Sequence, residues 1–480
     1  MSPSAKFSTR ARPRLVAGLA SAAASAFQSR RATRAADQPD IIVLLTSDVR
    51  AGDEIALPQT LARIADNGTT FPNFFLTTSL CCPSRASIFT GLYSHNHGVH
   101  DNRVGWEGFA KRGNRGRTTG VMLQAAGYRT AAIGAYLNGP QPGRGKEPGW
   151  DIGPIAGGRR KKNRSKNGGG SEKRNGRRDR DRNAAAGRND ADRIDKAVSV
   201  IVETAVDQPL YLHLGFSTAH IPVRPRPPYA GQFAGTRVDR DPSFDEHDVS
   251  DKPRYIRDLP RLNAGDEAWL DRLHRGRLET LLELDDGIAE LWDALEARGR
   301  LENTYVFLLS DNAFSLGHHR WAGKIAPYDQ SVRAPMFAFG PGFSAGAVHN
   351  RLVGNIDIAP TLVEIAEAGG PAMDGVSLLA YELRDAILLE MRAPNNRSMQ
   401  WPGPRTEIPR FSALRTSTHL YAEYRTGERE LYDYGSDPYE LDNLLANWNG
   451  HTPSSQAETM AVQLAGRLSA LRDCAGTSCL

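Results

Sequence analysis

The chain has few cysteines and no long apolar run beyond its first residues, and each absence excludes a class of protein. Four cysteines among 480 residues are too few for a fold built on disulfides. After residue 36, no apolar stretch approaches the roughly 20 residues that a membrane-spanning helix needs, so no integral membrane segment is predicted. The composition, 40% hydrophobic and 24% charged, is ordinary for a globular protein with a sizeable core.

Positive charge is concentrated in two segments. Residues 1–36 hold seven basic residues and no acidic one, and residues 157–183 hold twelve basic residues against three acidic ones. These segments carry +7 and +9 while the whole chain carries only +5, so the remainder has a net charge of −11. An acidic body gives little support to a nucleic-acid-binding fold, and no nucleic-acid partner is predicted.

The two basic segments differ in character. In residues 1–36, basic residues precede the apolar, small-residue stretch Leu15–Phe27, which is the order of an export signal and predicts a secreted, periplasmic or otherwise extracytoplasmic protein. An organelle-targeting peptide and a disordered tail are the alternatives. Residues 157–183 contain no large apolar side chain, which predicts an exposed insertion; binding of a sulfated polymer is the alternative.

Between residues 40 and 373 the apolar pattern alternates strands with helices. Continuous apolar runs are typical of strands buried on both faces, and apolar residues at helical spacing separate them. This alternation predicts an α/β fold with a large, mostly parallel central sheet. The predicted strands are Ile41–Leu45, Leu210–Phe216 and Tyr305–Leu309; the predicted helices are Leu61–Asp66, ended by Gly68, then Ile194–Ala205 and Leu281–Leu295.

From Asp374 onward the segments shorten and turns become frequent, which predicts a smaller C-terminal domain over residues 374–480. Leu414–Tyr424 and Glu430–Asp433 are expected to form hairpin strands, and Ala457–Leu471 a closing helix. Cys474 and Cys479 are expected to form a disulfide if the protein is exported, with two free thiols as the alternative.

The most informative segment is Ser79–Gly91. Pro83 suits the first turn of a helix, so Cys81 and Cys82 are expected at a helix N-terminus, where free backbone N–H groups favour an anion. A side chain there is placed to attack an anionic ester, with Arg85 one turn along to hold charge. On residue types alone, a pair of buried structural cysteines is the alternative.

Cys81-Cys82-Pro83-Ser84-Arg85 resembles the type I sulfatase signature, Cys-x-Pro-Ser-Arg, and residues 91–98 resemble the N-acetylglucosamine-6-sulfatase and arylsulfatase branch of that family. The resemblance implies that Cys81 is oxidised to Cα-formylglycine by a formylglycine-generating enzyme. The hydrated aldehyde has one hydroxyl to attack sulfur and a second whose deprotonation expels sulfate, where a serine or cysteine would stay sulfated. The implied fold is an alkaline-phosphatase-like α/β sandwich, over residues 40–373, with a smaller α+β C-terminal domain.

Polar side chains follow two of the predicted strands, at the sheet edge where ligands converge in α/β folds. Asp48 follows the first strand, and Asp311 and Asn312 follow the third. Their oxygens suit a hard cation, which would offset charge on the sulfate oxygens. An Asx turn is the alternative for Asp311 and Asn312. The resemblance implies that these three residues, with the modified Cys81, bind Ca²⁺ or Mg²⁺.

The resemblance also implies which residues hold the substrate. Arg85 and Lys324 match positions that stabilise charge on the sulfate, and Lys324 binds it. His220 matches the histidine proposed to protonate the leaving alcohol or to bind sulfate. Asn138, at the end of Gly134–Asn138, is expected to reach the substrate.

Two residues depart from the family pattern. Ser47 stands where a second aspartate is usual, which removes one negative charge from the cation site and weakens binding. Ala135 stands where a lysine is usual, and the loss of one polar stabiliser lowers a rate by about 10²–10³-fold.

The sequence therefore predicts a sulfuric ester hydrolase, with activity reduced by these losses, that acts on a sulfated carbohydrate or a related alkyl or aryl sulfate. The alternative is a catalytically impaired sulfatase-fold protein that binds sulfated polymers. A phosphatase or phosphonate hydrolase relative is a third interpretation.

Overall fold

A large sheet organises the first three quarters of the chain in the computed structural model, which describes residues 38–139, 147–155, 190–381, 384–393, 406–447 and 452–479. Within these ranges the sheet has eight strands. In spatial order they are β11 (Ala347–Val348), β2 (Thr69–Thr70), β10 (Met336–Phe339), β7 (Thr304–Ser310), β1 (Asp40–Thr46), β6 (Leu210–Gly215), β4 (Arg129–Gly134) and β5 (Ile152–Ile155). Strands β7, β1, β6, β4 and β5 run parallel and β10 antiparallel, which confirms the predicted, mostly parallel sheet.

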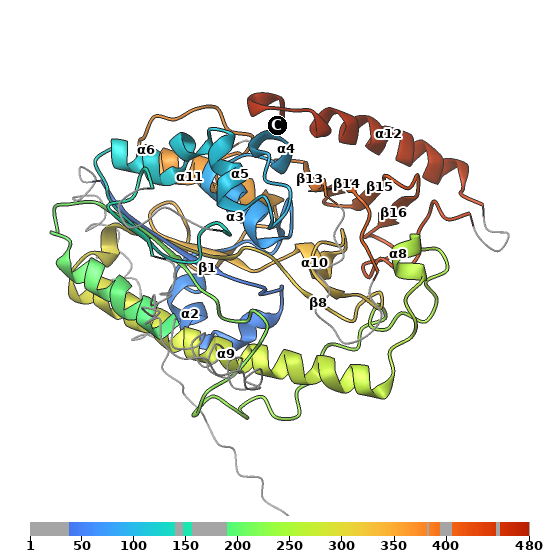
Figure 1. The fold of residues 1–480 in the computed structure, drawn as a ribbon, viewed down its shortest axis with the longest axis horizontal. Helices are drawn as coiled ribbons and strands as arrows, with labels where there is room; N and C mark the ends of the chain where they lie inside the picture. The colour runs from blue at the N-terminus through green and yellow to red at the C-terminus, as the bar shows by residue number, and fades with distance from the viewer. Residues whose placement is uncertain are drawn as a thin grey trace, which may run out of the picture. The chain divides into compact units, whose positions relative to one another are not determined.

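Helices cover both faces of this sheet (Figure 1). On one face lie α3 (Cys81–Thr90), α4 (Ser94–His97), α5 (Gly105–Lys111), α6 (Thr119–Ala125) and α11 (Ile358–Ile365); on the other lie α2 (Pro58–Thr60) and the long α9 (Ala264–Ala297). Side chains of β1 alternate between two apolar clusters, Val43 packing in the cluster that contains Phe89 of α3 and Leu44 in the cluster that contains Leu281 of α9. The strand is thus buried on both faces, as predicted.

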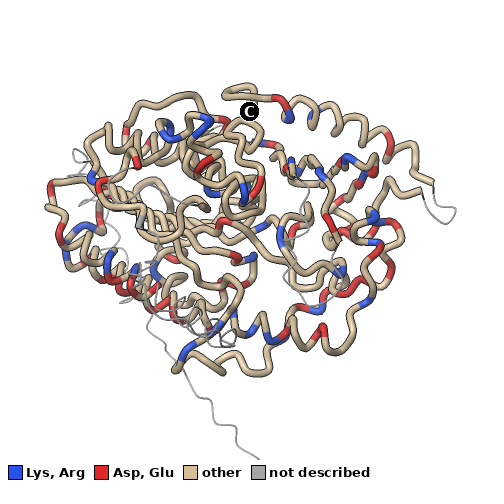
Figure 2. Tube along the Cα trace, in the orientation of Figure 1, with Lys and Arg blue, Asp and Glu red and all other residues tan. Residues whose placement is uncertain are grey.

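The shorter elements complete the fold around this sheet. No helix among the described residues has the length and apolar character to cross a bilayer. Acidic residues recur along α9 (Figure 2). The remaining elements of the region are η1 (Asp53–Ala56), η2 (Leu61–Ala65), β3 (Phe74–Phe75), η3 (Asn114–Arg117), α8 (Arg254–Arg257), η4 (Leu301–Asn303), β8 (Ser315–Leu316), β9 (Ala322–Gly323), α10 (Asp329–Val332), β12 (Val353–Gly354) and η5 (Asn355–Asp357).

Two predicted helices are present with other bounds, and one glycine has another role. Residues 190–203 are helical, and α9 extends far beyond the predicted Leu281–Leu295. Gly68 does not end a helix through a left-handed conformation. A Cβ at this position would lie 2.2 Å from the carbonyl oxygen of Ala338, so glycine is required because two backbone segments approach closely.

The C-terminal residues form a separate antiparallel sheet with one covering helix (Figure 1). Its strands are β13 (Ala386–Met391), β14 (Phe411–Thr416), β15 (His419–Tyr424) and β16 (Arg429–Asp433), followed by α12 (Ser455–Arg472) and η6 (Gly476–Cys479). The predicted segment Leu414–Tyr424 is not a single strand, because the chain turns after Thr416 and returns as β15, which pairs with β16 as a hairpin. The predicted closing helix and the Cys474–Cys479 disulfide are confirmed. The boundary at Asp374 stays a prediction, as do the features predicted for residues 1–36 and 157–183, which lie outside the described residues.

A buried carboxylate joins this second sheet to the segment that follows α3. Glu390 of β13 accepts hydrogen bonds from the backbone N–H of His95 at 2.9 Å and from Arg392 Nε at 2.7 Å, and His95 Nδ1 lies 3.0 Å from it. Burial alone would raise the pKa of Glu390, but His95 and Arg392 outweigh it and lower the pKa to about 2. The charged form therefore stabilises the fold.

We expect Glu390→Gln to lower the free energy of unfolding at pH 7 by about 1–3 kcal/mol, because the buried donors lose a charged acceptor. A pKa lowered in the folded state gives stability that is present above the unfolded value near 4.5 and is lost as pH falls toward 2. Urea unfolding between pH 7 and pH 2.5 measures both effects. The acid loss should be shallower in the variant, and equal slopes would contradict this assignment.

Candidate active site

The ends of two neighbouring parallel strands bring the predicted cation ligands together. Thr46 of β1 stands opposite Ser310 of β7, so the residues that follow each strand emerge side by side at the carboxyl edge of the sheet. Asp48, Asp311 and Asn312 are fully buried there. Asp48 has a φ of 67°, which an aspartate tolerates better than most residues and which turns the chain sharply after the strand.

Helix α3 begins at Cys81, as predicted, with Pro83 in its first turn. The backbone N–H of Cys82 donates to Asn102 Oδ1 at 2.9 Å. Just before the helix, the hydroxyl of Ser79 donates to the carbonyl of Ser331 at 2.5 Å and accepts from the N–H of Ala313 at 3.3 Å. One hydroxyl thus joins the nucleophile segment to the end of β7 and to the segment after β9.

Lys324 lies between the carboxylate of Asp48, which follows β1, and the thiol of Cys81 in α3. Its Nζ is 3.3 Å from Cys81 Sγ and forms an ion pair with Asp48 Oδ1. Only 3% of Lys324 and 6% of Cys81 is exposed. Burial alone would raise the pKa of the Cys81 thiol, but the ammonium outweighs it and lowers that pKa. Burial would lower the pKa of Lys324, and Asp48 and Cys81 raise it instead. The arrangement therefore favours negative charge at position 81.

Arg85 holds the other carboxylate. Its Nη2 lies 2.5 Å from Asp311 Oδ2 and its Nη1 donates to the carbonyl of Tyr136 at 3.1 Å. Burial is the larger influence on Asp311 and raises its pKa even though the guanidinium lowers it. Arg85 lies one turn into α3, so its charge stands close to position 81, as the signature spacing predicts.

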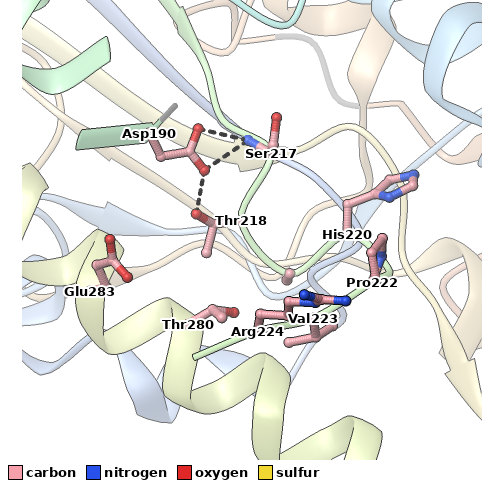
Figure 3. A pocket seen from close by; sticks show the side chains of 10 residues that line it. Asp190, Ser217, Thr218, His220, Pro222, Val223, Arg224, Thr280 and Glu283 are labelled. Carbon is pink, nitrogen blue, oxygen red and sulfur yellow. Dashed lines mark hydrogen bonds between the residues drawn. The ribbon is translucent and has the colours of Figure 1, made fainter. Parts of the chain in front are cut away.

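His220 lies on the loop that follows β6. Its Nδ1 is 2.6 Å from the carbonyl oxygen of Ile221, which only accepts, so Nδ1 carries a proton. A ring nitrogen of His220, a carboxylate oxygen of Asp48 and Cys81 Sγ all lie within 4.8 Å of one another. Asp48 is the main cause of a raised pKa at His220. Figure 3 shows a pocket beside this histidine, lined by Asp190, Ser217, Thr218, Ala219, His220, Pro222, Val223, Arg224, Thr280 and Glu283.

Asn138 is the one predicted site residue that the structure does not join to this group. Its carbonyl accepts from Trp106 N–H at 2.7 Å, and among the described residues no hydrogen bond links its side chain to Cys81 or Lys324. Ala135, half-buried beside it, donates its N–H to Gly215 at 2.9 Å and provides no charge.

The donor set fits a hard cation. Asp48 Oδ2, Asp311 Oδ1 and Asn312 Oδ1 are buried oxygens that have no hydrogen-bond partner among the described residues. Carboxylate and amide oxygens without partners are the ligands that Ca²⁺ and Mg²⁺ require. The Ser47 hydroxyl, 3.5 Å from Asp48 Oδ1, adds a neutral oxygen where a carboxylate would add charge.

The sequence did not indicate two residues that shape this site. Ser79 carries no motif signal beyond its position before the signature. Arg277 of α9 is fully buried, 3.5 Å from Asp53 Oδ2, and is among the cations that lower the pKa of Asp48 after burial has raised it. Helical spacing predicts that position 277 faces inward, but not that an arginine there affects the charge of a proposed cation ligand.

A family model described as Sulfatase matches residues 39–368, and a second, described as N-sulphoglucosamine sulphohydrolase, C-terminal, matches residues 317–472. The chain belongs to the sulfatase family, which confirms the resemblance seen in the sequence.

Relatives in that family are similar over different lengths. A putative extracellular sulfatase Sulf-1 homolog of Caenorhabditis elegans is 34% identical over 351 residues, which cover 71% of this chain and 49% of the relative. The extracellular sulfatase SULF-1 homolog of Drosophila melanogaster is 30% identical over 81% of this chain and 34% of its own length, so this chain spans half or less of both relatives. The N-acetylglucosamine-6-sulfatase of Homo sapiens is 27% identical over 92% of this chain and 86% of its length.

Solved structures share the fold. A protein in complex with its substrate D-glucosamine-2-N,6-O-disulfate superposes with a TM-score of 0.67 at 20% identity, covering 90% of this chain and 98% of the other. The phosphonate monoester hydrolase of Agrobacterium radiobacter gives a TM-score of 0.65 at 18% identity, covering 90% and 95%. These likenesses confirm the predicted alkaline-phosphatase-like architecture.

We expect Ser47→Asp to bind Ca²⁺ more tightly than the unaltered chain, because affinity at oxygen sites rises with the number of charged ligands. Ser47→Asn is the matched control, since it adds a similar volume without charge. Titration calorimetry and the Ca²⁺-dependent rise in melting temperature measure the effect. Equal affinities for the aspartate and asparagine variants would show that position 47 does not face the cation.

Proposed function

We propose that the chain is a sulfuric ester hydrolase that uses Cys81, converted to Cα-formylglycine, to cleave sulfate esters. The observation that carries this proposal is the approach of Lys324 Nζ to within 3.3 Å of Cys81 Sγ, at the N-terminus of α3 and beside Asp48. The sulfur stands where the formylglycine hydrate would place its attacking oxygen. The signature and the family membership support the conversion, which requires a formylglycine-generating enzyme as a partner.

Each neighbouring side chain has a chemical role in this proposal. Cys81, as the hydrated aldehyde, supplies a hydroxyl that attacks sulfur and a second one whose deprotonation releases sulfate. Lys324 and Arg85 hold negative charge on the sulfate oxygens as the ester bond breaks. As an imidazolium, the form that Asp48 favours, His220 gives the proton of the ring nitrogen that does not bond to Ile221 to the leaving alcohol and becomes neutral.

Asp48, Asp311 and Asn312 would hold a divalent cation, Ca²⁺ or Mg²⁺, together with the converted Cys81. Bound there, the cation supplies a Lewis acid that polarises a sulfate oxygen. The three buried oxygens without partners support this assignment. We also propose that Asn138 contacts the substrate, because the segment Gly134–Asn138 resembles the corresponding segment of the sulfatase family.

We propose a sulfated sugar as the substrate class. Relatives named N-acetylglucosamine-6-sulfatase align over most of both chains, and a structure with the same fold holds a disulfated glucosamine. An extracytoplasmic location is proposed because the Cys474–Cys479 disulfide persists in oxidising compartments and because the relatives of the worm and the fly are named extracellular.

Ser47 and Ala135 support a second candidate, a sulfatase-fold protein that has lost most of its activity and binds sulfated polymers. The first residue removes a negative charge from the proposed cation site and the second removes a positive charge from the proposed sulfate site. Both candidates place sulfate at Cys81, and they differ in turnover.

We expect sulfate release from an aryl sulfate to disappear in Cys81→Ala, because the nucleophile is removed. Cys81→Ser is the matched control, since its hydroxyl would accept the sulfuryl group and keep it. Ion chromatography of released sulfate and mass spectrometry of the peptide across position 81 measure the two outcomes. Release that persists in Cys81→Ala, or release of phosphate in preference to sulfate, would reject the proposed function.

Restoring the missing lysine separates the two candidates. We expect Ala135→Lys to raise kcat by about 10²-fold, because a cation returns to the proposed sulfate site. Ala135→Met adds similar length without charge and should leave kcat unchanged. An inert Ala135→Lys protein in which the aldehyde at position 81 is confirmed would favour the binding protein.

A further inference from the structure

A buried carboxylate braces the loop that carries His220. Asp190, the first described residue of the helix 190–203, is 7% exposed. Its two oxygens each accept from the backbone N–H of Ser217 at 3.1 Å, and Oδ2 also accepts from the hydroxyl of Thr218 at 2.5 Å. Figure 3 shows these bonds, with the ring of His220 turned away from Asp190.

Arg193, one turn further along the same helix, contacts both Asp190 and the loop. Its Nη1 forms an ion pair with Asp190 and donates to Ser217 Oγ at 2.8 Å. Arg193 is 8% exposed, and its side chain lies against the end of β4, where a Cβ on Gly134 would stand 2.9 Å from Arg193 Cδ. Arg193 therefore packs against the end of β4, and Asp190 binds the segment that follows β6.

The loop that it holds is short and strained. His220 N–H donates to the carbonyl of Ser217 at 3.1 Å, so a single turn joins the braced residue to the histidine. Between them Ala219 has a φ of 72°, a left-handed conformation that is unfavourable for a non-glycine residue. A strained conformation persists only where neighbouring contacts stabilise it. The hydrogen bonds that Ser217 and Thr218 donate to Asp190 are such contacts.

We propose that Asp190, together with Arg193, is a positioning residue that fixes the His220 ring against Cys81 and Asp48 and so governs protonation of the leaving alcohol. Among the described residues, Asp190 has no hydrogen bond to Cys81, Asp48 or His220, and it acts through the turn Ser217–His220. This inference rests on the proposed function for its kinetic consequence, whereas the position of the ring is a property of the fold alone.

The kinetic test compares two leaving groups. An aryl sulfate with an acidic phenol leaves without protonation, but an alkyl or sugar sulfate needs the proton. We expect Asp190→Ala to lower kcat for the alkyl sulfate by about 10²-fold and kcat for the aryl sulfate by less than about tenfold, with KM little changed. In a His220→Ala background, Asp190→Ala should add no further loss on the alkyl sulfate.

Asp151→Ala is the matched control. Asp151 also accepts from a strand N–H and a threonine hydroxyl, those of Thr130 at 2.9 and 3.0 Å, but it does so at the opposite end of β4. We expect this variant to lose stability without any leaving-group dependence. Equal losses on both substrates in Asp190→Ala, or a further loss in the His220→Ala background, would overturn the positioning role.

A crystal structure of Asp190→Ala tests the proposal without activity. We expect His220 to lose its 2.6 Å contact with the Ile221 carbonyl and to move away from Cys81 and Asp48. An unmoved ring would overturn it. If the unaltered chain releases sulfate from neither substrate, the proposed function fails, and the displaced or unmoved ring still decides the role of Asp190.

Discussion

The site depends on one buried ammonium shared by a carboxylate and a thiol. Lys324 contacts both Asp48 and Cys81 where almost no water reaches, so each partner relies on it for compensation. Removing one member of a buried charge group leaves the others uncompensated, at a cost of about 3–5 kcal/mol. The fold brings the three together from distant parts of the chain: a strand end, a helix N-terminus and the segment after β9. The hydroxyl of Ser79 also links the segment before α3 to the end of β7 and to the segment after β9.

Parallel strands explain why much of the site was predictable. Asp48 and Asp311 follow apolar runs recognised in the sequence, and parallel pairing puts the ends of neighbouring strands at one edge. Pro83 marked the start of α3, and with it the position of Cys81. The placement of these residues needed only local pattern and the rule that strands in such a sheet run the same way, whereas their roles were implied by the resemblance to the sulfatase signature.

Other features depend on contacts between distant residues, which no local pattern encodes. Gly68 resembled a helix stop, but its role is the close approach of the Ala338 carbonyl. Asp190 follows a low-complexity segment and carries no motif, yet its carboxylate braces the His220 loop. Arg277 lowers the pKa of Asp48 although it lies on α9, far from Asp48 in the sequence. The two departures, Ser47 and Ala135, remove one charge of each sign, so relative to the family pattern they leave the formal charge of the site unchanged.

The central claim is that position 81 carries an aldehyde that turns over sulfate esters. It is tested most directly by producing the chain with increasing amounts of a formylglycine-generating enzyme and measuring, in each preparation, the aldehyde fraction at position 81 and the rate of sulfate release. We expect a rate proportional to the aldehyde fraction and no release from the wholly thiol protein. A rate independent of that fraction, or a fully converted chain that releases no sulfate, would contradict it.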